Sequence, residues 1–167
     1  LAGQKIVGIV VSHYHADHIG YAGALASLTG APIYMGAIEY EQALWGLNQT
    51  DADYAAMMVT IYRQFDLADI HINAAHNTGN YYRSLVGDLP EVTLVDNAHA
   101  FITKTGRWQV RFDAGHSPGH MSLTDKDRRL YICVDFLLPR ISPNISVKLR
   151  DLNPDILADY LHYLDTM

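Results

Sequence analysis

The sequence predicts a layered α/β fold, in which helices pack against β-sheets. Three observations support this prediction. An apolar, β-branched run near the start is followed by a helical segment and a second strand. A longer helical segment occupies the middle of the chain, and several short strands with intervening turns follow it. The chain of 167 residues is long enough for one hydrophobic core, so we expect residues 1–167 to form a single domain.

The first predicted strand is Ile6–Val11, a nearly continuous apolar run typical of a buried parallel strand. Small and apolar residues at Gly20–Thr29 predict a helix that packs closely on a sheet and ends at Gly30. Pro32–Met35 predicts a second short strand. Strand, loop, helix and strand in this order indicate a βαβ unit.

A helical insert is predicted from about residue 36 to residue 90. Thr50 or Asp51 is a suitable N-cap for its second helix. Apolar side chains recur there at spacings of three and four, at Tyr54, Met57, Met58, Ile61, Tyr62 and Phe65. This stripe predicts a helix face buried on its own domain. The alternative is a lid whose methionine and aromatic side chains line a substrate pocket.

The second half of the chain predicts short strands and a final helix. The expected strands are Val92–Val95, Phe101–Lys104, Trp108–Phe112 and Arg129–Val134, with turns at residues 105–106 and 125–128. Pro154 is placed at the start of an amphipathic helix with apolar residues at Ile156, Leu157, Tyr160, Leu161 and Leu164.

The composition excludes several classes of function. Twelve basic residues against 18 acidic ones give a net charge of -6, and no basic cluster is present, so nucleic acid is not an expected partner. No apolar run approaches the roughly 18 residues that a membrane helix needs, so no membrane partner is expected either. With no secretory signal in the sequence, we expect a cytoplasmic protein that acts on a small molecule.

Three imidazoles and one carboxylate fall within residues 13–18, His-Tyr-His-Ala-Asp-His. His13 and His15 are two residues apart, so in an extended segment their side chains leave the same face and form half of a zinc site. Asp17 and His18 follow where the chain turns into a helix, in a position to serve a second ion. The setting between an apolar strand and a small-residue helix argues against a histidine-rich surface loop.

Two later segments carry further candidate residues. The segment 113–120, Asp-Ala-Gly-His-Ser-Pro-Gly-His, contains His116 and His120. An apolar strand ends at Asp135, where a lone aspartate is most often a turn or cap residue. A catalytic zinc ion usually has three protein ligands and one water, so the pair in the first motif needs a third partner.

Together these motifs make the sequence similar to the metallo-β-lactamase superfamily, whose hallmark is His-x-His-x-Asp-His between a strand and a helix. The resemblance implies a four-layer αββα sandwich with a site for two metal ions. It implies that His116, in the Gly-His-Ser/Thr-x-Gly turn, completes the first site with His13 and His15. His120 is expected to have a supporting or structural role.

The resemblance also implies that Asp135 bridges the two ions, with Asp17 and His18 on the second ion. Val134 departs from the superfamily, which commonly has glycine immediately before this aspartate. The superfamily also has strands before the first motif and a further histidine after the final helix, so we expect a sandwich that is incomplete at both ends. The other histidines, His71, His76, His99 and His162, are expected to be surface or structural residues.

The function implied by the resemblance is that of a zinc-dependent hydrolase that uses a metal-bound hydroxide, with two zinc ions in the complete site and iron or manganese as alternative metals. Asp17 would orient the nucleophile or move its proton. The apolar insert favours an ester, thioester or lactone substrate. One alternative is a mononuclear iron dioxygenase acting on sulfur compounds through His13, His116 and Asp135. Another is a fragment that binds metal without catalysis.

Overall fold

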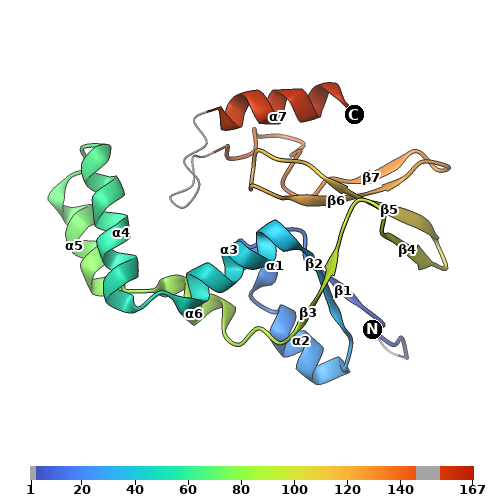
Figure 1. The fold of residues 1–167 in the computed structure, drawn as a ribbon, viewed down its shortest axis with the longest axis horizontal. Coiled ribbons are helices and arrows are strands. Elements are labelled where there is room, and N and C mark those ends of the chain that lie inside the picture. Colours follow the sequence, from blue (N-terminus) through green and yellow to red (C-terminus); the bar gives the residue numbers. More distant parts are fainter. Residues whose placement is uncertain (1–2, 146–154) are drawn as a thin grey trace.

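The computed structural model describes residues 3–145 and 155–167 and contains two β-sheets with helices on their outer sides (Figure 1). The first sheet is parallel, in the order β1-β2-β3: Ile9–Val10, Ile33–Gly36 and Val92–Val95. The second is antiparallel, in the order β4-β5-β6-β7: Ala100–Thr103, Gly106–Phe112, Met121–Asp125 and Leu130–Ile132.

The helices of the described ranges fall into three groups. Between β1 and β2 lie α1 (Ala16–Ile19) and α2 (Ala22–Thr29). Between β2 and β3 lie α3 (Ala37–Asn48), α4 (Asp51–Gln64), α5 (Asp69–Thr78) and α6 (Tyr81–Val86). After the second sheet comes α7 (Ile156–Asp165), which lies along that sheet on the side away from α1, α2 and α3 (Figure 1).

The central strand β2 shows how the layers form, because successive side chains of a strand face opposite sides. Ile33 and Met35 are buried in the cluster between the first sheet and its helices. Tyr34 points the other way and packs against Val110 and Met121 of the second sheet. The order is therefore helices, sheet, sheet, helix, which confirms the predicted αββα sandwich.

Local sequence signals set several helix ends as predicted. Gly30 ends α2 in the left-handed conformation at φ 69°, which glycine adopts at little cost. Of the two candidate caps of α4, Thr50 is the N-cap: its hydroxyl oxygen accepts a hydrogen bond from the backbone N–H of Asp53 at 3.1 Å. The helical insert predicted for residues 36–90 is confirmed by α3 to α6.

Two sequence predictions differ from the structure. The first strand is shorter than predicted, with only Ile9–Val10 paired. Strand β6 was missed, because Met121–Asp125 carries polar residues and follows a glycine-rich turn. One of those polar residues, Ser122, is buried against Asp113. The predicted start of the last helix at Pro154 lies outside the described residues.

The apolar stripe of α4 is buried only at the base of the helix. Tyr54 is buried, and Met57 and Met58 pack against the core, but Phe65 at the far end is 70% exposed. The α4–α5 pair extends away from the sandwich in Figure 1, and α5 contains no buried residue. No helix within the described ranges is long and apolar enough to cross a membrane.

Candidate metal centre

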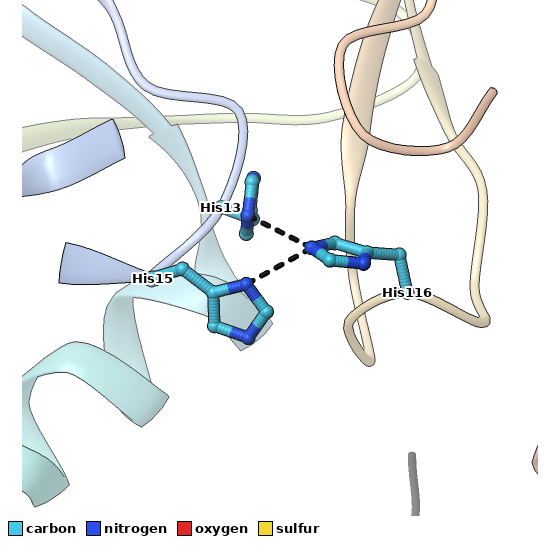
Figure 2. Close-up of side chains that lie close together, drawn as sticks. All are labelled: His13, His15 and His116. Atoms are coloured by element: carbon cyan, nitrogen blue, oxygen red, sulfur yellow. Dashed lines mark hydrogen bonds between the residues drawn. The ribbon is translucent and has the colours of Figure 1, made fainter. Parts of the chain in front are cut away.

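Three histidine side chains meet where the two sheets adjoin (Figure 2). His13 and His15 follow β1, and His116 comes from the loop between β5 and β6. The Nε2 atom of His116 lies 3.2 Å from Nε2 of His13 and 2.9 Å from Nδ1 of His15. Nitrogen ligands at about 2.0–2.1 Å from a tetrahedral zinc ion are roughly 3.3 Å apart. The observed spacing fits one metal ion.

The opposite nitrogens of two of these rings have hydrogen-bond partners. The backbone carbonyl of Asn144 lies 3.0 Å from His116 Nδ1, and a carbonyl only accepts. His116 Nδ1 therefore carries the proton in the neutral ring, and Nε2 presents its lone pair to the centre. The Ser12 hydroxyl lies 2.9 Å from His13 Nδ1, and a hydroxyl can accept the Nδ1 proton when Nε2 faces the centre. The donor set suits a cation.

A second group of candidate ligands consists of His13, His18 and Asp135. His18 Nε2 lies 3.2 Å from Asp135 Oδ2, and the same oxygen lies 3.5 Å from His116 Nε2. The carboxylate of Asp135 thus lies between the two groups, where a bridging ligand would be placed. No further histidine joins this second group within residues 3–145 and 155–167.

Asp17 lies outside both groups. Its side chain is 79% exposed, and its Oδ2 lies 3.6 Å from His18 Nε2. The carboxylate is therefore at the edge of the centre, in contact with solvent, where proton transfer is feasible. Its roles as a metal ligand and in proton transfer both stay predictions.

Burial keeps two of the histidines in the neutral form. Desolvation, followed by the nearby His15 and His18, lowers the pKa of His13 far below its ordinary value. Burial also lowers the pKa of His120 to about 4, with His116 as the next cause. A neutral His13 is the form that binds metal.

His120 is fully buried and belongs to neither ligand group. Its ring centroid is 5.1 Å from that of His13 and 6.2 Å from that of Phe136. Neither ring nitrogen has a hydrogen-bond partner among the described residues. His120 therefore lies beside the ligand groups, and its supporting role stays a prediction.

The loop that carries His116 begins at Asp113, a buried residue to which sequence reasoning assigned no role. The carboxylate of Asp113 accepts a hydrogen bond from the hydroxyl of Tyr131 at 2.8 Å and forms an ion pair with Arg111. Arg111 also donates to the backbone carbonyl of Tyr163 near the end of α7. These contacts connect the loop to both its own sheet and the last helix.

Val134, immediately before Asp135, has a φ of 46°. A β-branched residue rarely adopts this left-handed region, because its side chain crowds the backbone. The strain lies next to the carboxylate that connects the two ligand groups.

The remaining histidines lie outside both groups. His71, His76 and His162 are exposed. His99 packs between aromatic rings, with centroid distances of 5.9 Å to Tyr34 and 4.7 Å to Phe101.

Comparison with known proteins agrees with this fold. The model of the family described as "Metallo-beta-lactamase superfamily" matches residues 1–167. A beta-lactamase domain protein from Burkholderia ambifaria is 27% identical with a TM-score of 0.75, over 99% of this chain and 47% of that one. A metallo-beta-lactamase family protein from Thermus thermophilus is 19% identical with a TM-score of 0.77, over 96% and 50%.

A third solved structure is that of TTHA1623 in a di-iron-bound form, 20% identical with a TM-score of 0.59, over 99% of this chain and 66% of that one. The chain belongs to the metallo-beta-lactamase superfamily. The chain spans about half the length of the first two structures.

Proposed function

We propose that this protein is a zinc-dependent hydrolase of an ester, thioester or lactone. The observation that carries the proposal is the convergence of three imidazole nitrogens, two of them 2.9 and 3.2 Å from His116 Nε2, with the Asp135 carboxylate between them and a second group. Imidazole nitrogens at this spacing favour a cation, and burial keeps His13 in the neutral form that binds metal. The superfamily membership supports the reaction class.

In this proposal His13, His15 and His116 hold the first ion, and His18 and Asp135 hold the second. Bound metal would supply Lewis acidity, which polarises a substrate carbonyl and lowers the pKa of a water molecule toward about 7. Asp17, at the exposed edge, takes up or delivers a proton through solvent.

The test is metal content together with hydrolysis of a phenyl ester, a thioester and a lactone. We expect about two zinc ions per chain and a fall in kcat/KM of at least about 100-fold for His116→Ala. The matched control is His71→Ala, an exposed histidine of α5, which should retain metal and activity. If His116→Ala keeps both metal and activity, the site assignment is wrong.

The same preparation tests the dioxygenase alternative. Bound iron with oxygen consumption in place of hydrolysis would favour the dioxygenase. Iron has to be included in the metal measurement because TTHA1623 has a di-iron-bound form.

The apolar residues of the helical insert favour a substrate with an apolar acyl group. Met57 and Met58 are half-buried in the same cluster as Tyr14, the residue between two proposed ligands. We expect the triple variant Met57→Ala, Met58→Ala and Tyr62→Ala to raise KM more for long acyl chains than for short ones. Equal effects across chain lengths would contradict a role for α4 in acyl binding.

A further inference from the structure

Glu39 is a fully buried carboxylate in the first turn of α3, and it contacts both loops that carry histidines. Its Oε2 atom accepts a hydrogen bond from the backbone N–H of Tyr14 at 3.0 Å. Its Oε1 atom accepts one from the backbone N–H of Gly119 at 2.6 Å. One side chain therefore connects two loops that are 105 residues apart (119 minus 14).

The two contacted residues lie beside the proposed ligands. Tyr14 stands between His13 and His15, and Gly119 follows His116 by three residues. An acidic residue in the first turn of a helix ordinarily stays near the surface and stabilises the helix through its dipole. Glu39 instead is 0% exposed, and both carboxylate oxygens accept hydrogen bonds from other segments. Burial of a carboxylate is costly unless it is hydrogen-bonded in this way.

Two further contacts fix the same backbone segments. The hydroxyl of Tyr82, on α6, donates to the backbone carbonyl of Tyr14 at 2.6 Å, so this residue is held through both its N–H and its C=O groups. Gly119 lies so close to α3 that an added Cβ would be 2.9 Å from Cβ of Ile38. The approach of the His116 loop to Glu39 therefore depends on a glycine at this position.

We propose that Glu39 is the positioning residue of the metal centre: its carboxylate holds the loop of His13 and His15 and the loop of His116 at metal-binding spacing. This inference rests on the proposed function, because it assumes that these three histidines bind one ion. Glu39 acts through the backbone of the two loops.

The test is a titration with Co²⁺ alone, followed by the visible absorption of the bound ion and by competition with a chelator. In Glu39→Gln an amide N–H₂ group replaces one acceptor oxygen and faces a backbone N–H donor. We expect affinity for Co²⁺ to fall about 10- to 100-fold, the usual range for residues that orient metal ligands, with a changed absorption spectrum. The matched control is Glu41→Gln, the same substitution at an exposed position of α3, which should bind as wild type does.

A second variant covers the case in which Glu39→Gln does not fold. Gly119→Ala leaves the Glu39 side chain in place but pushes the His116 loop away from α3. We expect a similar loss of affinity and a similar spectral change. The double variant should lose little more affinity for Co²⁺ than either single variant, because both substitutions break the same contact.

The outcomes separate this inference from the proposed function. If wild type binds Co²⁺ and both Glu39→Gln and Gly119→Ala bind it with unchanged affinity and spectrum, Glu39 is not a positioning residue, and the metal site stands. If wild type binds no Co²⁺, the proposed function fails, and this inference fails with it.

Discussion

At the scale of single residues, two positions allow sharp tests. The first is Val134, whose φ of 46° is unfavourable for a β-branched residue and easily adopted by glycine. Both substitutions, to alanine and to glycine, remove the two Cγ methyl groups, and only alanine keeps Cβ, so a comparison of these two variants isolates the effect of Cβ at this backbone angle. At an ordinary φ, glycine is about 0.5–1 kcal/mol less stable than alanine.

At position 134 we expect the reverse order. Val134→Gly should be more stable than Val134→Ala by about 1 kcal/mol, because alanine keeps the left-handed strain and glycine does not. Urea unfolding of the two variants measures this difference. A more stable alanine variant would show that the angle is not strained in solution.

Asp17 is the second residue, and its exposure separates two roles. For Asp17→Asn we expect unchanged metal content and a fall in kcat of about 100-fold or more, because the amide cannot exchange a proton at neutral pH. Metal analysis and steady-state kinetics on one preparation decide the question. Loss of metal in this variant would show that Asp17 is a ligand, as the superfamily pattern implied.

At the scale of the elements, Asn80 joins two helices and is almost fully buried. Its side-chain amide donates to the carbonyls of Gly46 and Gln49 at the end of α3, at 2.8 and 2.9 Å. Its oxygen accepts from the backbone N–H of Arg83 and caps α6. A single asparagine therefore satisfies backbone groups of both helices.

We expect Asn80→Ala to lower the free energy of unfolding by about 2–3 kcal/mol. Asn80→Ser should recover about 1 kcal/mol, because serine remains a good N-cap but cannot reach both carbonyls. Thermal unfolding measures this as a difference of roughly 2–4 °C per kcal/mol for a chain of this size. Equal losses in the two variants would contradict the capping role.

The elements also show what sequence can and cannot predict. The helix end at Gly30 and the cap at Thr50 depend on neighbouring residues, so local patterns predicted them. Strand β6 was missed because its polar Ser122 is buried through a contact with Asp113, which lies in the loop after β5. Glu39 was missed for a similar reason, since its partners lie 25 and 80 residues away in the chain.

At the scale of the whole molecule, the buried neutral histidines make stability depend on pH. An unfolded histidine has a pKa near 6.5, but His120 in the folded protein has a pKa of about 4, and that of His13 is also lowered. Below pH 6.5 the unfolded chain binds protons that the folded chain does not. The free energy of unfolding therefore decreases as the pH is lowered below 6.5, by about 1.4 kcal/mol per pH unit for each such histidine.

We expect this loss between pH 6.5 and pH 5 for the protein in chelator, measured by urea unfolding. His120→Leu removes one titrating group. It should reduce the slope of the free energy of unfolding against pH by the amount that one proton contributes. The exposed His162→Ala is the control and should leave the slope unchanged. A slope that His120→Leu does not alter would mean that this histidine is protonated in the folded state.

The placement of the three histidines in Figure 2 has a mechanical consequence. His13 and His116 are 103 residues apart in the chain and belong to segments that follow different sheets. An ion bound to both acts as a reversible staple. A covalent crosslink that closes a loop of about 100 residues lowers the entropy of the unfolded chain and so stabilises the folded state by about 4.7 kcal/mol. Chelation should therefore lower the melting temperature as well as remove activity. In the proposed site, the ion that supports catalysis would also stabilise the contact between the two sheets.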